Sequence, residues 1–288
     1  MKKVVLVTGA NGQLGNAIQR LAPEYENCLF YFTDIDTLDI LKKEQIETYV
    51  RDNQIQYIIN CAAYTAVDKA EDDRELAMCI NHDAVRNIAE VAQQNNVSVI
   101  HVSTDYVFDG TASDPYREDA QTAPTSVYGI TKLAGENVLQ KICPQSVIIR
   151  TAWLYSEFGT NFVKTMMRIG AERNELNVVS DQIGSPTYAG DLADAIMKIV
   201  DHLTFVPGIY HYSDEGVCSW YDFAKEIMHM ANLNCQVHPI STSEYPTPAK
   251  RPAYSVLDKT KIKQVYHVFI PDWKISLNTC IQNLLNNR

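Results

Sequence analysis

The feature that most constrains the fold is a glycine-rich loop directly after a run of aliphatic and β-branched residues. Residues 3–8 (KVVLVT) are typical of a strand buried on both faces of a parallel sheet. Gly9, Gly12 and Gly15 follow, and a helical pattern then extends to Leu21. Glycines in this context permit a tight turn and let the backbone approach a pyrophosphate at a helix N-terminus. The stretch therefore predicts a dinucleotide-binding strand–loop–helix unit rather than a plain turn.

An acidic residue after the next strand pattern bears on the choice of cofactor. Residues 28–33 predict a second strand, and Asp34 follows it, where a carboxylate can hold the ribose hydroxyls of adenosine. Asp34 would repel a 2′-phosphate, and no arginine stands beside it to receive one. We therefore predict NADH or NADPH as the cofactor, with NADH preferred. The alternative is that Asp34 and Asp36 are only turn or capping residues.

Strand and helix patterns alternate over the first 180 residues. Further strands are predicted at 57–60, 97–102, 146–151 and 176–179, and helices at 44–54, 74–95, 128–139 and 161–170. This alternation predicts an α/β fold with a Rossmann-type doubly wound parallel sheet. Beyond it the pattern loosens, with helices predicted at 191–200 and 220–231 and a strand at 208–212. We therefore divide the chain into residues 1–180, an NAD(P)-binding Rossmann domain, and residues 181–288, a smaller C-terminal substrate-binding domain, with an approximate boundary that the chain can cross back over.

Three side chains form a candidate catalytic group. Tyr128 and Lys132 lie one turn apart on the same face of a predicted helix. A nearby ammonium lowers the pKa of a phenol and makes it usable as a general acid or base. Thr104 ends the fourth predicted strand and can reach the same point in space. The alternative is a surface tyrosine over a solvated lysine, with Thr104 as an ordinary strand end.

Composition excludes several classes of partner. The formal net charge of −10 over 288 residues argues against nucleic acid or a membrane surface, but leaves room for an anionic small molecule. The chain contains no run of about 18 apolar residues, so the sequence predicts no membrane-spanning helix. The 7 cysteines form no Cys-x-x-Cys pair, and the 7 histidines show no metal-ligand spacing. We therefore predict a reduced, cytoplasmic protein without a metal site.

Seven stretches spread over both halves of the chain form a larger set of motifs: 9–15, 62–71, 103–110, 128–136, 150–153, 181–187 and 245–252. Together they resemble the extended branch of the short-chain dehydrogenase/reductase family and, within it, the dTDP-4-dehydrorhamnose reductases. The spread makes the resemblance more specific than the glycine loop alone. The departures are small: Ala10 and Asn11 in a variable part of the loop, and Tyr64 where some relatives carry histidine.

The resemblance implies NAD(P)H-dependent reduction of a 4-keto nucleotide sugar, dTDP-4-dehydro-L-rhamnose to dTDP-L-rhamnose, in the last step of dTDP-rhamnose biosynthesis. It implies that Tyr128 donates the proton, Lys132 holds the nicotinamide ribose and Thr104 stabilises the oxyanion. The expected partner is a dTDP-sugar, with the protein a monomer or a homodimer. The expected cofactor-binding residues are Gly9, Asn11, Gly12, Gln13, Leu14, Gly15, Asp34, Asp39, Ile40, Ala62, Ala63, Tyr64, Thr65, Tyr128 and Lys132.

The expected substrate-binding residues are Thr104, Asp105, Trp153 and Arg251. The first three follow from the resemblance. Arg251 is our candidate for the diphosphate, because a guanidinium can bind an anion through two donors. The alternative is a solvent-exposed arginine on a loop.

Proteins with three other functions have similar sequences. A 4,6-dehydratase is disfavoured, because dehydratases carry an acidic residue right after the Thr-Asp pair and this chain has Tyr106 there. A nucleotide-sugar epimerase stays open, and tightly retained cofactor would favour it. A non-catalytic regulatory subunit of S-adenosylmethionine synthesis is the alternative outside enzymes. The presence of Thr104, Tyr128 and Lys132 together weighs against that alternative.

Overall fold

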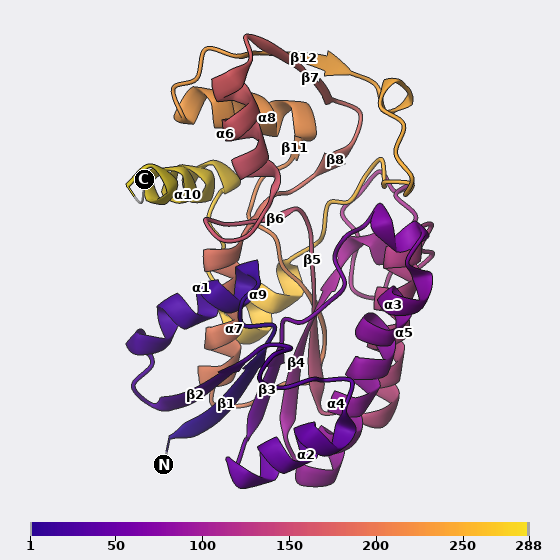
Figure 1. Cartoon of the computed structure of the whole chain (residues 1–288), viewed down its shortest axis with the longest axis vertical. Coiled ribbons are helices and arrows are strands. Elements are labelled where there is room, and N and C mark those ends of the chain that lie inside the picture. The colour runs from indigo at the N-terminus through magenta and orange to yellow at the C-terminus, as the bar shows by residue number, and fades with distance from the viewer. Residues whose placement is uncertain (1, 287–288) are drawn as a thin grey trace.

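A computed structural model describes residues 2–286 and contains a six-stranded parallel sheet (Figure 1). Its strands are β1 (Lys3–Thr8), β2 (Cys28–Thr33), β3 (Tyr57–Asn60), β4 (Ser98–Thr104), β5 (Ser146–Thr151) and β10 (Gly208–His211). They stand in the order β10-β5-β4-β3-β1-β2. The chain order reverses between β1 and β3, and open α/β sheets bind ligands at the carboxyl ends of the strands on either side of such a point. The predicted Rossmann-type doubly wound sheet is confirmed.

Helices cover both faces of the sheet, which explains its apolar strands. Val5 and Val7 of β1 pack into the core on one face, and Leu6 packs into the core on the other. Successive side chains of a strand point to opposite faces, so a sheet covered on both sides needs apolar residues at every position. The covering helices appear on the two sides of the sheet in Figure 1: α1 (Gln13–Leu21), α7 (Ala189–Asp201) and α9 (Thr260–Tyr266) on one, and α2 (Lys43–Asp52), α4 (Ala84–Asn95) and α5 (Val127–Ile142) on the other.

The helix predicted over residues 74–95 is interrupted. It consists of α3 (Arg74–Met78), a π-helical segment (Cys79–Asp83) and α4. The interruption lies where α5 approaches, since a Cβ on Gly135 would overlap the carbonyl oxygen of Asn81. Such π segments are frequent at functional sites. The apolar periodicity on which the prediction was based does not reveal the extra residue that a π-helical turn contains.

The strand predicted at 176–179 exists but does not join the central sheet, so its assignment as the sixth strand is wrong. It is β7 (Glu175–Val179), which pairs with β12 (Gln236–Ile240) in a separate two-stranded parallel sheet. Glu175 and Asn177 are exposed, which a strand covered on both faces could not accept. The sixth position belongs to β10, which pairs with β5.

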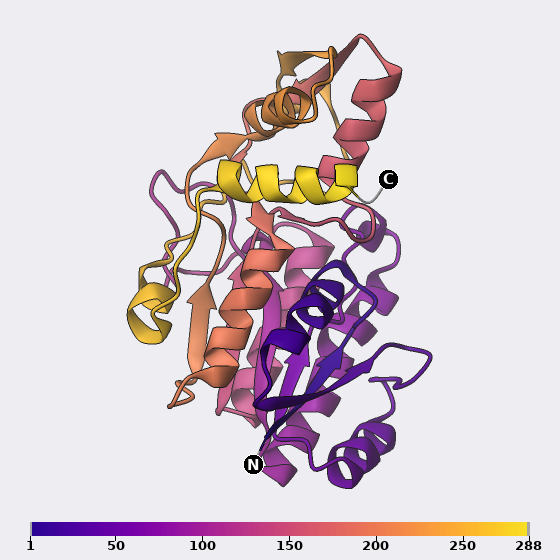
Figure 2. The ribbon, with the colours of Figure 1, turned by 90° about the vertical axis from the view of Figure 1, so that its left-hand side faces the viewer.

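A second, smaller lobe lies above the carboxyl ends of the strands (Figures 1 and 2). Its core joins α6 (Phe162–Glu172), α8 (Trp220–Met230) and α10 (Trp273–Asn286). Short strand pairs link it to the sheet: β6 (Leu154–Tyr155) with β9 (Thr187–Tyr188), and β8 (Ile183–Gly184) with β11 (Cys218–Ser219). The helices α9 and α10 were not predicted.

The chain crosses between the lobes more than once. Helix α6 and strand β7 precede residue 180 yet pack in the upper lobe, whereas α7, β10 and α9 follow it and pack on the central sheet. The division into residues 1–180 and 181–288 as separate domains stays a prediction. In space, the second half contributes to both lobes.

Two further observations concern membrane helices and cysteines. None of the helices within residues 2–286 is both long enough and apolar enough to cross a membrane. All seven cysteines are free thiols.

Candidate active site

The glycine loop lies against the loop that follows β3. Gly9 has a φ of +64°, and a Cβ at this position would lie 2.6 Å from the backbone nitrogen of Ala62. A side chain would therefore be strained by the backbone angle and also collide with the neighbouring loop. The contact joins the ends of β1 and β3, which is the point where the strand order reverses.

The N-terminus of α1 is suited to an anion. Its N-cap is Gly12, and no side chain among the described residues caps it. The first N–H groups of a helix have no partner within the helix, and the helix dipole favours negative charge there. Gly12 and Gly15 also line the main cleft. These residues fit the pyrophosphate of a dinucleotide.

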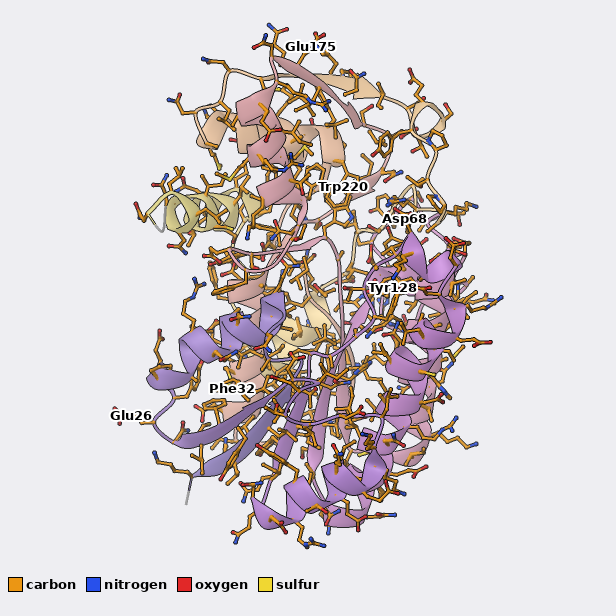
Figure 3. The ribbon with its side chains drawn as sticks, in the orientation of Figure 1. Glu26, Phe32, Asp68, Tyr128, Glu175 and Trp220 are labelled. Atoms are coloured by element: carbon orange, nitrogen blue, oxygen red, sulfur yellow. The ribbon has the colours of Figure 1, made fainter. Side chains whose placement is uncertain are left out.

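A cleft of about 570 Å³ lies between the two lobes and collects most of the predicted site. The predicted residues that line it are Gly9, Gly12, Gln13, Leu14, Gly15, Ala63, Thr65, Thr104, Asp105, Tyr128, Lys132, Trp153 and Arg251. The lining residues that were not predicted as site residues are Cys61, Val67, Val102, Ser103, Tyr106, Thr151, Ala152, Leu154, Gly159, Thr160, Asn161 and Trp220. Figure 3 labels Tyr128 on the lower lobe and Trp220 on the upper lobe.

Six predicted cofactor residues do not line this cleft: Asn11, Asp34, Asp39, Ile40, Ala62 and Tyr64. Asp34 lies beside the glycine loop, where its Oδ2 accepts a hydrogen bond of 2.9 Å from the backbone N–H of Asn11. The carbonyl oxygen of Ile40 accepts from Asn87. The hydroxyl of Tyr64 donates to Asp73, so its ring serves the local structure.

Tyr128 and Thr104 meet at the floor of the cleft. Ser126 caps α5 by accepting from the N–H of Gly129, which fixes the first turn of the helix that carries Tyr128. Burial raises the pKa of Tyr128 to about 12, and the nearby Thr104 hydroxyl acts in the opposite direction. Because both residues line the same cleft, their hydroxyls can reach one substrate oxygen.

Lys132 does not tune Tyr128 in the way the sequence predicts. Its Nζ donates to the carbonyl oxygen of Val102 at 2.7 Å. Burial lowers the pKa of this ammonium to about 8, which the charge of Glu136 partly opposes. The pKa of Tyr128 is raised rather than lowered, because burial of the phenol dominates and Lys132 is not among the groups that shift it. Tyr128 consequently stays protonated at neutral pH, as a proton donor must.

Asn81 does not line the cleft but supports it from behind through hydrogen bonds, and sequence reasoning gave it no role. Its Oδ1 accepts from the N–H of Tyr64 at 2.9 Å, and its Nδ2 donates to the Tyr64 carbonyl and the Thr131 hydroxyl, both at 3.1 Å. It thereby ties the loop after β3 to the turn of α5 between Tyr128 and Lys132. Its signal in the sequence was a polar residue inside an apolar helical pattern.

A pair of stacked indoles forms the upper wall. The rings of Trp153 and Trp220 have centroids 3.6 Å apart and planes at 11°. Trp153 has a φ of +50°, unusual for a bulky residue, and a Cβ on Gly184 would contact its ring. Trp153 and Trp220 lie on either side of the predicted boundary at residue 180, and only Trp153 was predicted as a site residue.

Arg251 is held by an acidic partner. Its Nη1 and Nη2 donate to the two carboxylate oxygens of Asp68, at 3.0 and 2.8 Å. The pair links the C-terminal segment to the loop after β3. The guanidinium also lines the cleft and is partly buried, so the alternative of a free surface arginine does not apply.

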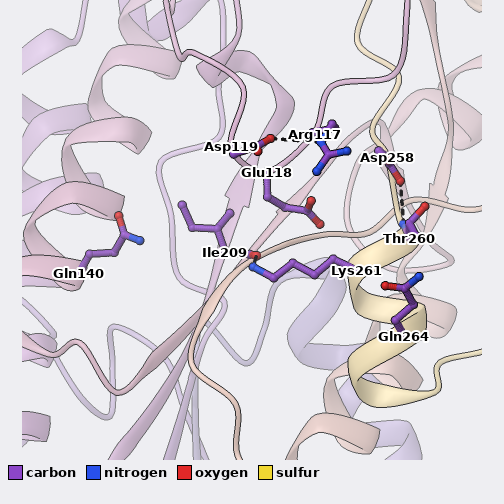
Figure 4. Close-up of a pocket in the computed structure, with 9 residues that line it drawn as sticks. All are labelled: Arg117, Glu118, Asp119, Gln140, Ile209, Asp258, Thr260, Lys261 and Gln264. Atoms are coloured by element: carbon purple, nitrogen blue, oxygen red, sulfur yellow. Dashed lines mark hydrogen bonds and ion pairs between the residues drawn. The ribbon is translucent and has the colours of Figure 1, made fainter.

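A larger hollow of about 730 Å³ shares no lining residue with this cleft (Figure 4). Among its charged groups, Arg117 pairs with Asp119, and Lys261 donates to the carbonyl oxygen of Ile209. It contains none of the predicted catalytic residues. Within residues 2–286, no group of three or more His, Cys, Asp or Glu side chains is arranged to hold a metal ion.

Comparison with known proteins identifies the family. A family model described as the RmlD substrate binding domain matches residues 1–286. A curated dTDP-4-dehydrorhamnose reductase from Aggregatibacter actinomycetemcomitans is 42% identical over 284 residues, which cover 95% of this chain and 96% of the relative. The chain belongs to the dTDP-4-dehydrorhamnose reductase family.

Solved structures of dTDP-4-dehydrorhamnose reductases have the same fold. One from Clostridium acetobutylicum has a TM-score of 0.94 at 42% identity, covering 98% of this chain and 99% of the other. One from Bacillus anthracis, solved in complex with NADP, has the same TM-score and identity and covers 98% and 100%. The resemblance found in the sequence motifs is thus confirmed.

Proposed function

We propose that this protein is an oxidoreductase that reduces dTDP-4-dehydro-L-rhamnose to dTDP-L-rhamnose with a nicotinamide cofactor. The observation that carries the proposal is the meeting of Thr104 and Tyr128 in a cleft that also contains the glycine loop and Lys132. The names of the relatives support the substrate. The cofactor would supply a hydride to the ketone carbon.

The chain's own residues would handle the ketone oxygen. Tyr128 donates its proton to that oxygen, and the Thr104 hydroxyl donates a hydrogen bond to it. Negative charge grows on the oxygen as the hydride arrives, so these donors act more strongly in the transition state than on the bound ketone. Lys132, on the turn below Tyr128, would hold the nicotinamide ribose.

The upper part of the cleft would bind the sugar nucleotide. Asp105 and Trp153 line the cleft near Thr104 and would contact the sugar. Arg251 would bind the diphosphate through donors that Asp68 leaves available, since a guanidinium has five N–H groups. Residues of both lobes line the cleft, which supports a substrate larger than a simple ketone.

We expect NADH to be preferred to NADPH by at least about tenfold in kcat/KM, because the carboxylate of Asp34 beside the loop would repel a 2′-phosphate. The Asp34→Asn variant removes the charge and keeps the shape, so its preference should move towards equality. Steady-state kinetics with both cofactors measures this. Equal kcat/KM values in the wild-type protein would show that Asp34 does not set the cofactor preference. The NADP-bound relative from Bacillus anthracis makes the comparison informative.

The function itself is tested by NADH consumption on addition of the 4-keto dTDP-sugar, with the product identified by NMR. We expect stoichiometric oxidation of NADH and dTDP-L-rhamnose as the product. An epimerase would retain its cofactor and consume no NADH. A binding protein without activity would bind NADH and leave the sugar unchanged. Either result would contradict the proposal.

We further propose that the enzyme works in the cytoplasm, as a monomer or a homodimer. Seven free thiols, five of them buried, support a reducing compartment. Fractionation of cells and light scattering of the purified protein would test the two statements.

A further inference from the structure

The Thr104 hydroxyl is already engaged on two sides. Its Oγ1 accepts from the N–H of Tyr106 at 3.2 Å and donates to Oδ1 of Asp105 at 3.0 Å. Thr104 and Asp105 are 4% and 2% exposed, so water does not compete for these bonds. The single hydroxyl proton of Thr104 therefore points at the neighbouring carboxyl group.

A hydroxyl group has one proton to donate. An ionised carboxylate can only accept hydrogen bonds. It therefore engages the Thr104 hydroxyl proton, which is then not available to a substrate oxygen. A neutral carboxylic acid can itself donate to Thr104 Oγ1. The Thr104 proton is then free to turn towards the cleft, where Tyr128 lies within reach. The protonation of Asp105 thus decides where the Thr104 donor is aimed.

We propose that Asp105 is a positioning residue that has to be protonated for Thr104 to aim its hydroxyl at the reacting ketone oxygen. This rests on the proposed reduction. Asp105 has no bond of its own to the reacting oxygen in this role and acts through Thr104. Losing one such donor to an oxyanion costs about 10²–10³-fold in rate.

The surroundings of Asp105 make the neutral acid easier to form than it is in water. Burial raises its pKa to about 6, which hydrogen bonds from Ser255 and Thr104 partly oppose. Its Oδ2 is buried without a well-aligned partner among the described residues. The ionisable groups that respond to its charge are Tyr106 and Tyr128, whose pKa values burial raises far above neutral pH.

The cationic side chains that line the cleft are those of Lys132 and Arg251. Lys132 is bound to the Val102 carbonyl, and Arg251 is neutralised by Asp68. Neither is paired with the Asp105 carboxylate. The state of Asp105 is therefore set mainly by burial and by the two hydroxyls of Ser255 and Thr104.

The test is the pH dependence of kcat/KM for the 4-keto dTDP-sugar between pH 6 and 8. For the wild-type protein we expect a fall of at least about tenfold over this range, because kcat/KM reports ionisations of the free enzyme. Asp105→Asn keeps a donor towards Thr104 and cannot ionise. Its kcat/KM should stay within about threefold across the range and exceed the wild-type value at pH 8.

Two further variants make the test specific. Thr104→Val removes the donor, so kcat/KM should be low and lack the alkaline fall, whether or not Asp105→Asn is added. This variant also tests the proposal if Asp105→Asn does not fold. Asp119→Asn changes an exposed carboxylate outside the cleft and should keep the wild-type profile.

An active wild-type protein with a flat profile would overturn the role of Asp105. So would an Asp105→Asn variant that retains the alkaline fall, or that is inactive at every pH while folded. A wild-type protein that does not reduce the 4-keto sugar at any pH would instead overturn the proposed function, so the two failures are distinguishable.

Discussion

Replacing Tyr128 with phenylalanine should lower kcat by about 10²–10⁴-fold and leave NADH binding largely intact. The variant keeps the ring that packs edge-on against Tyr106, with centroids 5.5 Å apart, and removes only the hydroxyl. The proton donor is lost, while the glycine loop and Lys132, which would hold the cofactor, are untouched. Turnover is measured by NADH consumption and binding by fluorescence titration.

A matched control is Tyr49→Phe. Tyr49 lies on α2, packs edge-on against Tyr31 and does not line the cleft. Loss of its hydroxyl should leave kcat near the wild-type value. Turnover of Tyr128→Phe within about threefold of wild type would show that another group donates the proton.

Replacing Arg150 with methionine should lower the free energy of unfolding by about 3–5 kcal/mol, because it leaves the Glu136 carboxylate buried without its cation. Arg150 on β5 binds both carboxylate oxygens of Glu136 on α5, at 3.0 and 2.7 Å. Their side chains are only 3% and 1% exposed. Ser103, next to Thr104, donates to the same carboxylate. Denaturant unfolding measures the change.

The control is Arg168→Met, which breaks the exposed pair with Glu172 on α6, whose side chains are 63% and 58% exposed. Its cost should be about 0.3–0.5 kcal/mol. Adding Glu136→Leu to Arg150→Met removes the orphaned charge and should restore most of the lost stability. If the Arg150→Met variant alone were as stable as Arg168→Met, the buried pair would be unimportant for the stability of the fold.

The buried pair also bears on the site, since Glu136 lies one turn beyond Lys132 on the same helix. Arg150 and Ser103 anchor that helix to the ends of β5 and β4. The register of α5 against the sheet, and hence the meeting of Tyr128 with Thr104, depends on such contacts. The sequence motif included Arg150 but gave no hint of its partner.

The sequence was sufficient where neighbours along the chain decide the structure. Continuous apolar residues predicted the central strands, and Gly9 to Gly15 predicted the loop, because backbone freedom and periodicity are local properties. The strand at 176–179 was assigned to the wrong sheet, because its hydrogen-bonding partner, β12, lies 60 residues away in the chain. Trp220 and Asn81 were missed for the same reason.

The amino-acid order by itself thus determined the doubly wound sheet, the cofactor loop and the family, with Thr104, Tyr128 and Lys132 as candidates. Only the tertiary structure decided how these groups ionise and where their protons point. Burial raises the pKa of Tyr128, whereas the Lys132 argument predicted that it would fall, and the Asp105 carboxyl accepts a hydrogen bond from the Thr104 hydroxyl. Both outcomes depend on how completely water is excluded, which distant segments packed around the site determine together.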